Sequence, residues 1–122
     1  TVHAPELPST RHMLAAPQLA MMRDGAWVVN TARGSLIDTS ALEAELTTGR
    51  LNAFIDTPDP EPLPAESPLY DLPNVVLTPH LAGSSGNEIA RLGALAVTEV
   101  ERFAAGLDPL YPVHFGDLER IA

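Results

Sequence analysis

The sequence predicts an α/β fold built on a parallel sheet. Three short apolar runs, at residues 26–30, 52–55 and 75–77, alternate along the chain with segments of helical pattern. Strands that alternate with helices are typical of parallel sheets joined by right-handed crossovers. The length of 122 residues, with 45% hydrophobic residues, is enough for one small domain with a core.

The composition narrows the possible partners. The formal net charge is −9, and all seven basic residues are arginines. We expect no nucleic-acid or membrane partner, since nucleic acid needs a basic face and no apolar run approaches the roughly 20 residues of a membrane helix. The first residues do not resemble a signal peptide. Cysteine is absent, which excludes disulfides and thiolate metal sites, so we expect a cytoplasmic protein without a metal.

The first part of the chain is expected to contain a strand end, a helix and a strand. Residues 2–5 have the pattern of a strand that began upstream. Pro17 suits the first turn of a helix, which should stop near Gly25. Residues 26–30 form an apolar run without alternation, which predicts a buried strand. The apolar side of the helix carries Leu19, Met21 and Met22.

A second helix is expected shortly after this strand. Asp38 is interpreted as a helix cap, and Ser40 with Glu43 has the spacing of a capping box. The helix should stop at Gly49, since glycine is favoured at that position. Its apolar face carries Leu42 and Leu46.

Two more strands are expected in the second half. Residues 52–56 form a short strand that ends in a carboxylate, and six prolines make residues 57–73 an irregular loop. Residues 75–77 form a third buried strand, which Thr78-Pro79 stops.

The last predicted element is a long helix from about residue 86 to 105. Ser85 and Glu88 have the spacing of a capping box, and Gly106 closes the helix. Its apolar stripe consists of Ile89, Leu92, Leu95, Ala96, Val100 and Phe103.

Four polar residues follow the strands at their carboxyl ends. Arg33 follows the first strand, Asp56 and Glu61 follow the second, and His80 follows the third. Ligands of open parallel sheets bind beyond these ends. Arginine can hold a carboxylate with two hydrogen bonds, and a histidine beside a carboxylate can deliver a proton to a carbonyl oxygen. The pattern favours chemistry on a small acid.

Each of these residues also has a structural interpretation. Arg33 could be solvated, His80 could be structural, Asp56 could cap a turn, and Glu61 lies between two prolines, where a solvated carboxylate is common. A hydrolase that uses His80 and Glu61 has little support, since no serine lies in a nucleophile-elbow motif.

Several motifs in the same order resemble one known family. The segments HAPELPSTRHML, MMRDGAWVVNTARGSLIDTSAL, GRLNAFID, DPEPLP and SPLYDLPNVVLTPHLAG, followed by a long helix, are similar to the D-isomer-specific 2-hydroxyacid dehydrogenases. The resemblance runs from residue 1 to about residue 106. It implies a partial doubly wound, Rossmann-like sheet, the second half of a dinucleotide-binding domain.

The resemblance also implies an activity. It is the reduction of a 2-keto acid to a D-2-hydroxy acid, and its reverse, with NAD or NADP as cofactor. Arg33 of the TARG motif would bind the substrate carboxylate, and His80 of the TPH motif would be the acid/base. Glu61 of the EP pair would pair with His80 and favour its protonated form. Residues that the resemblance places along the cofactor are His3, Pro5, Thr10, Thr31, Ala32, Arg33, Asp56, His80, Leu81, Ala82 and Gly83.

The chain departs from the family in one large respect. The glycine-rich G-x-G-x-x-G loop is absent from the 122 residues. We therefore expect residues 1–106 to be the C-terminal part of an NAD(P)-binding domain, and residues 107–122 to be a tail that returns to a missing substrate domain. Such a fragment should be inactive alone and should form a homo-oligomer, because its apolar tail lacks a partner. The alternative is an inert interaction module that keeps only the fold.

Overall fold

The computed structural model describes residues 1–118 and 120. It divides the chain into two compact units, the first from Thr1 to Ala82 and the second from Gly83 onwards. The sequence predicted a boundary after residue 106 instead, and the assignment of residues 107–122 to a returning tail stays a prediction. Three residues of that tail, 119, 121 and 122, lie outside the described residues.

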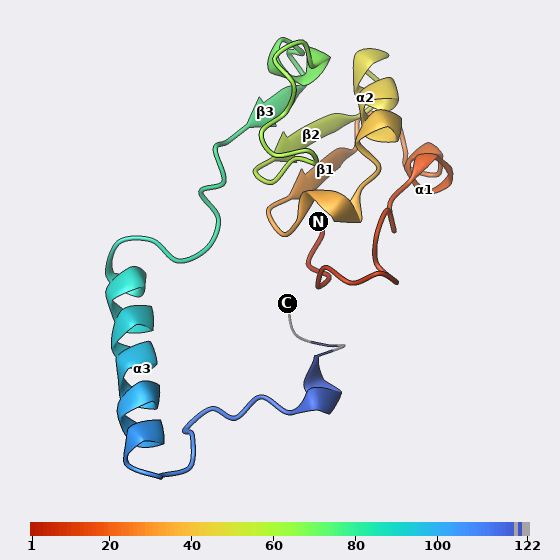
Figure 1. Cartoon of the computed structure of the whole chain (residues 1–122). Coiled ribbons are helices and arrows are strands. Elements are labelled where there is room, and N and C mark those ends of the chain that lie inside the picture. Colours follow the sequence, from red (N-terminus) through yellow and green to blue (C-terminus); the bar gives the residue numbers. More distant parts are fainter. Residues whose placement is uncertain (119, 121–122) are drawn as a thin grey trace. The chain divides into compact units, whose positions relative to one another are not determined.

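A parallel sheet forms the centre of the first unit (Figure 1). Its strands are β1 (Trp27–Asn30), β2 (Asn52–Ile55) and β3 (Val75–Leu77), in the order β1-β2-β3. Both strand pairs are parallel. The sequence predicted the end of a strand at residues 2–5, and the structure has a single parallel bridge there, which joins Val2 to Asn30 of β1. The predicted α/β fold with a parallel sheet is confirmed.

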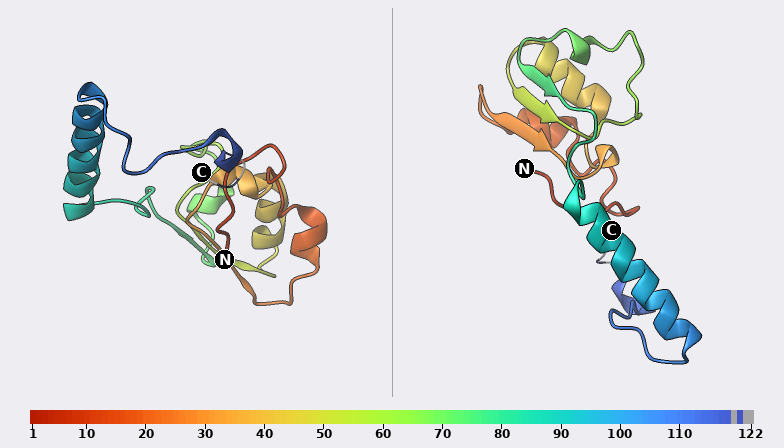
Figure 2. Two further views of the ribbon diagram at one scale, coloured as in Figure 1. Left: turned by 90° about the horizontal axis from the view of Figure 1, so that it is seen from below. Right: turned by 90° about the vertical axis from the view of Figure 1, so that its left-hand side faces the viewer.

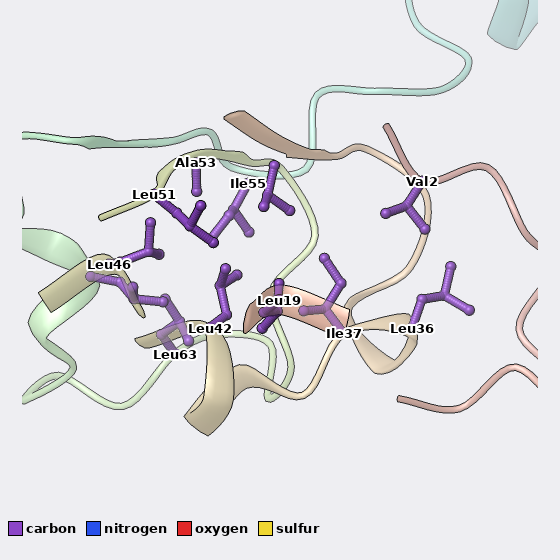
Figure 3. Packing of buried hydrophobic residues seen from close by; sticks show 12 residues of the cluster. Val2, Leu19, Leu36, Ile37, Leu42, Leu46, Leu51, Ala53, Ile55 and Leu63 are labelled. Carbon is purple, nitrogen blue, oxygen red and sulfur yellow. The ribbon is translucent and has the colours of Figure 1, made fainter. Parts of the chain in front are cut away.

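Two helices cover one face of this sheet. They are α1 (Ala16–Ala20) and α2 (Thr39–Thr47), which contact each other and lie on the same side of the strands in both views of Figure 2. Figure 3 shows their leucines facing the inward side chains of β2. The buried apolar core consists of Val2, Leu19, Val28, Leu36, Ile37, Leu42, Leu46, Leu51, Ala53, Ile55, Leu63 and Leu69.

The opposite face of the sheet has no such cover within the first unit. Trp27 is 54% exposed and Val76 is 43% exposed on that face, whereas Val28 and Ala53 are buried on the other. The prediction that the runs 26–30 and 75–77 are buried is therefore wrong for this face. An apolar run without alternation indicates that both faces of the strand are apolar enough to be covered. It does not show that another element covers both faces.

Arg50 ties the end of α2 to the end of α1. Its guanidinium donates to the carbonyls of Leu19 at 2.7 Å and Met22 at 2.6 Å, and its Nε donates to Glu45 at 2.6 Å. The hydrogen bond with Arg50 lowers the pKa of Glu45, and the same bond raises the pKa of Arg50. The helix α1 ends at Ala20 and not near Gly25 as predicted, and Arg50 bonds to one carbonyl inside this helix and one just beyond it.

The start of α2 confirms one predicted cap and contradicts another. Asp38 is the N-cap residue, and its carboxylate accepts a backbone amide hydrogen bond at 3.1 Å. The helix begins at Thr39, so Ser40 lies inside the first turn and cannot form the predicted capping box with Glu43. The Glu43 carboxylate instead accepts a hydrogen bond from the hydroxyl of Ser67 at 2.9 Å. The predicted loop 57–73 is irregular except for a short 3₁₀ helix, η2 (Pro68–Tyr70).

The second unit contains α3 (Asn87–Ala104) and a short 3₁₀ helix, η3 (Phe115–Asp117). The length of α3 agrees with the prediction, but its N-cap residue is Gly86, and the predicted box of Ser85 and Glu88 is wrong. All residues of α3 are described, and within their own unit none of them is buried. Among the described residues, no helix has the length and apolar content needed to cross a bilayer.

Candidate active site

Asn30 builds the turn that carries Arg33. The Asn30 side chain is buried at the end of β1. Its Nδ2 donates to the carbonyl of Arg33 at 2.8 Å, and its Oδ1 accepts from the amide of Ala32 at 3.1 Å. Asn30 was not among the residues predicted from the sequence, although an asparagine at a strand end is a known signal for such a turn. Arg33 is thus fixed through its backbone.

The side chain of Arg33 is half-exposed and loosely held. Its Nη1 donates to the carbonyl of Ala32 at 2.7 Å, and its Nε lies 3.9 Å from a carboxylate oxygen of Glu6. The other oxygen of Glu6 accepts a hydrogen bond from the hydroxyl of Ser35 at 2.7 Å. Glu6 was not predicted as a site residue, because nothing in the local sequence pattern shows that this distant residue meets Arg33. A guanidinium with such a long ion pair keeps N–H groups for a ligand.

Asp56 anchors the segment that carries His80. The Asp56 side chain is 1% exposed, and its carboxylate accepts hydrogen bonds from the hydroxyl of Thr78 and from the amides of Leu81 at 2.8 Å and Ala82 at 2.7 Å. Burial alone would raise the pKa of Asp56, but these hydrogen bonds and the neighbouring His80 hold its pKa below the ordinary 3.8. Asp56 therefore remains a carboxylate although it is buried.

His80 is presented to solvent in an unusual backbone conformation. Its φ is +52°, in the left-handed region that non-glycine residues rarely adopt. Its amide lies 3.1 Å from the carbonyl of Asp56 and 3.0 Å from that of Thr78, and donates to both. Nδ1 of the imidazole lies 2.9 Å from Oε1 of Glu61. The structure therefore contains the predicted Glu61–His80 pair, with both side chains about half-exposed.

One polar cavity brings the three predicted catalytic residues together. It has a volume of about 210 Å³, and Arg33, Glu61 and His80 all line it. A further arginine, Arg11, also lines it and was not among the site residues predicted from the sequence. Gly34 forms part of the wall, where a Cβ would lie 2.3 Å from the carbonyl group of Pro58. The turn after β1 and the loop after β2 thus meet at a glycine because no side chain fits between them.

A larger and mainly apolar cavity of about 550 Å³ shares His80 and Glu61 with the polar one. Its apolar walls come from Pro58, Pro62, Leu63, Tyr70, Leu77 and Pro79. The hydroxyl of Tyr70 donates to the carbonyl of Leu63 at 3.1 Å, which closes one side. The Glu61–His80 pair therefore lies between the polar cavity and the apolar cavity.

The residues predicted to contact a cofactor are spread over this edge. Thr31 and Ala32 are half-buried in the turn after β1. The hydroxyl of Thr10 bonds within its own turn, to the carbonyl of Pro5 at 2.6 Å, and the ring of His3 contacts Thr1 at 2.8 Å.

Two of these residues are already engaged with Asp56. The amides of Leu81 and Ala82 both donate to its carboxylate. Gly83 begins the second unit. In the described part of the chain, no three histidine, aspartate or glutamate side chains are arranged to hold a metal ion.

Comparison with known proteins identifies the family. Residues 1–82 match the family described as D-isomer specific 2-hydroxyacid dehydrogenase, NAD binding domain. The chain belongs to this family. The matched residues coincide with the first compact unit, and the predicted resemblance is confirmed.

Relatives within the D-2-hydroxyacid dehydrogenases are longer than this chain. A glycerate dehydrogenase from Methylorubrum extorquens is 39% identical over 110 residues, which are 87% of this chain and 35% of the relative. A D-3-phosphoglycerate dehydrogenase from Methanocaldococcus jannaschii is 36% identical over 107 residues, 87% of this chain and 20% of the relative. The chain thus spans about a fifth to a third of the length of such relatives.

Solved structures agree with the assignment. The TT0316 protein from Thermus thermophilus matches with a TM-score of 0.85 and 42% identity, over 92% of this chain and 36% of that one. A D-isomer specific 2-hydroxyacid dehydrogenase from Xanthobacter autotrophicus Py2, in complex with NADPH and MES, matches with a TM-score of 0.75 and 38% identity. That match covers 90% of this chain and 45% of the other. The first unit therefore has the Rossmann-like fold of this domain.

Proposed function

We propose that the full-length gene product interconverts a 2-keto acid and a D-2-hydroxy acid with NAD or NADP as cofactor. The observation that carries the proposal is the Glu61–His80 pair, 2.9 Å apart, in the same cavity as Arg33. Membership of the family supports it, as do the glycerate and phosphoglycerate dehydrogenases among the relatives. The 122-residue chain by itself is expected to be inactive.

Arg33 and His80 have complementary roles in this proposal. The planar guanidinium of Arg33 grips the substrate carboxylate and so fixes which face of the carbonyl is presented. Nδ1 of His80 faces Glu61, which leaves Nε2 for the carbonyl oxygen of the substrate. A protonated His80 neutralises the negative charge that develops on this oxygen and transfers its proton there. Glu61 holds the ring in this orientation.

The residues of this edge fit a nicotinamide cofactor. Thr31 and Ala32 are small, half-buried residues at the carboxyl end of β1, where doubly wound sheets bind nucleotides. The bound nicotinamide would supply or accept the hydride. We assign to the cofactor the residues His3, Pro5, Thr10, Thr31, Ala32, Arg33, Asp56, His80, Leu81, Ala82 and Gly83, with Asp56 acting through the segment that it anchors.

The proposal includes a cytoplasmic location and a homo-oligomer. The apolar stripe of α3 supports the oligomer, since it buries none of its residues within its own unit.

The test is steady-state kinetics of the full-length gene product with 2-keto acids and reduced nicotinamide. His80→Gln keeps a hydrogen-bonding group but removes the transferable proton, so kcat should fall by roughly two to four orders of magnitude with a smaller change in KM. The exposed His114 gives a matched control, and His114→Gln should retain the parent kcat. Equal kcat values for parent and His80→Gln would refute the assigned role.

A further inference from the structure

A second arginine lines the cavity that contains Arg33 and His80. Arg11 belongs to the turn before α1, where its amide donates to the carbonyl of Leu7 at 3.1 Å. Arg11 lines the same space of about 210 Å³, and its guanidinium lies beside Asp59, which also lines it. Two guanidinium groups thus face one small cavity, although the chain has only seven basic residues.

The ion pair of Arg11 is loose. Its Nη2 lies 3.6 Å from a carboxylate oxygen of Asp59, longer than the 2.7–2.9 Å of a charge-assisted hydrogen bond. Arg50 provides the contrast, with a 2.6 Å bond to Glu45 and bonds to two carbonyls. The side chain of Arg11 donates none of the hydrogen bonds found among the described residues. Arg50 is therefore structural, whereas Arg11 keeps its N–H groups for a ligand.

The charges of the cavity are arranged as separate pairs. Each cationic side chain has one carboxylate, with Asp59 beside Arg11, Glu6 beside Arg33 and Glu61 beside His80. The pairs of both arginines are 3.6 Å or longer, so an incoming anion can replace either carboxylate without breaking a short hydrogen bond. A cavity of this volume is smaller than the ~300–1,000 Å³ pockets of drug-sized ligands, so its occupant must be small.

We propose that Arg11 is a second anion-binding residue and that the substrate is a small 2-keto acid with a second acidic group. Carboxylate, phosphate and sulfonate share the chemistry that a guanidinium recognises. This inference rests on the proposed function, in which Arg33 binds the first carboxylate. The second acidic group then extends toward Arg11, which makes Arg11 a specificity-determining residue.

The test compares two keto acids of the same shape on the full-length gene product. Oxaloacetate carries a second carboxylate where 4-methyl-2-oxopentanoate carries an isopropyl group of similar shape. The parent should prefer oxaloacetate, and Arg11→Gln should lower the ratio of the two kcat/KM values about tenfold or more. Asp59→Asn should raise the ratio, since it removes the competing carboxylate. The exposed Arg23, before β1, gives the matched charge control, and Arg23→Gln should leave the ratio unchanged.

Several results would overturn the inference. An unchanged ratio in Arg11→Gln would do so, as would an equal loss for both acids. A loss of NADPH affinity without a change in the ratio would assign Arg11 to the cofactor instead. If the parent reduces neither these two acids nor any other 2-keto acid, the proposed function fails by itself, and calorimetry of oxaloacetate binding then decides. Weaker binding to Arg11→Gln than to the parent supports the second anion site, and equal or absent binding refutes it.

Discussion

Arg33 combines a fixed backbone position with a guanidinium that has no close carboxylate partner. Asn30 holds the carbonyl of Arg33, while the guanidinium has its nearest carboxylate, Glu6, at 3.9 Å. Asn30 thus fixes the position of Arg33, while the distance to Glu6 leaves the guanidinium available to a ligand. This separation leads to a first prediction about the shape of the side chain.

Arg33→Lys should impair the full-length enzyme more than charge conservation suggests. Lysine keeps the positive charge but loses the planar fork, so the acid is held less squarely. We expect kcat/KM to fall by roughly ten- to a hundredfold, with KM raised, in steady-state kinetics. Arg23→Lys, on the exposed turn before β1, is the control. If Arg33→Lys changes neither KM nor kcat, Arg33 is a solvated surface residue.

Asp56 predicts a pH dependence of stability. Its hydrogen bonds hold its folded-state pKa below the ordinary 3.8. A lowered carboxyl pKa stabilises the fold above the unfolded-state value, and that contribution is lost as the pH falls through the folded-state value. Urea unfolding of the parent and Asp56→Asn should therefore differ most from neutral pH down to about pH 4, and the difference should shrink below that pH. A difference that is the same at every pH would contradict this account.

Thr57, unlike Asp56, has a buried polar group without a hydrogen-bond partner among the described residues. This group is its hydroxyl, and the residue is 2% exposed. Thr57→Val replaces this hydroxyl with a methyl group and should raise the free energy of unfolding by about 1 kcal/mol. Thr78→Val is the matched control, since the Thr78 hydroxyl donates to Asp56 and its loss should destabilise the protein. Destabilisation by Thr57→Val would mean that a buried water satisfies the hydroxyl.

At the scale of elements, the site depends on how closely two loops approach. The turn after β1 carries Arg33, and the loop after β2 carries Glu61. They touch at Gly34, where an added Cβ would lie 2.3 Å from the Pro58 carbonyl and 2.6 Å from the amide nitrogen of Asp59. These are backbone atoms, so the clash with an added Cβ can be relieved only if one of the two loops moves.

Gly34→Ala should therefore separate Arg33 from the Glu61–His80 pair. A displacement of about 1 Å can cost roughly a hundredfold in rate, so we expect kcat/KM to fall by about that factor. The free energy of unfolding should fall by about 1–3 kcal/mol. Gly93→Ala is the matched control, because nothing lies within 4 Å of its added Cβ and alanine favours a helix. Normal kinetics in Gly34→Ala would show that the loops can adjust.

The sequence predicted the strands and the long helix well because their signals are local. Apolar runs located β1, β2 and β3 within a residue, and glycine marked the ends of α2 and α3. Asp38 was identified as a cap by the same kind of local pattern. The parallel direction of the strands followed from their alternation with helices.

Local sequence patterns could not predict the contacts between segments that are distant in the sequence. Capping-box spacing suggested Ser40 and Ser85, but the N-cap residues are Asp38 and Gly86. The three hydrogen bonds of Asp56 and the meeting of Glu6 with Arg33 join segments that lie far apart in the sequence. Arg11 was overlooked for the same reason. Motif order predicted which residues carry the chemistry, and the structure shows which contacts hold those residues in place.

At the scale of the whole chain, the two units differ in how they bury apolar residues. The first unit has a core of twelve buried apolar side chains and one covered face of its sheet. The second unit presents its apolar stripe without cover of its own, and Phe103 is 85% exposed. A contiguous exposed apolar stripe of this kind marks an interaction surface or invites association.

The 122-residue chain should therefore self-associate in solution through α3. Light scattering after gel filtration should give a dimer or larger species whose mass rises with concentration. Val100→Glu and Phe103→Glu place a charge within the stripe and should shift the chain toward the monomer, because a carboxylate is costly to bury in an apolar interface. The helical repeat puts Ala94 on the opposite side of α3, so Ala94→Glu adds the same charge and should leave the mass unchanged.

A parent chain that stays monomeric at high concentration would contradict the prediction. Equal effects of all three substitutions would show that net charge, and not the stripe, controls the association.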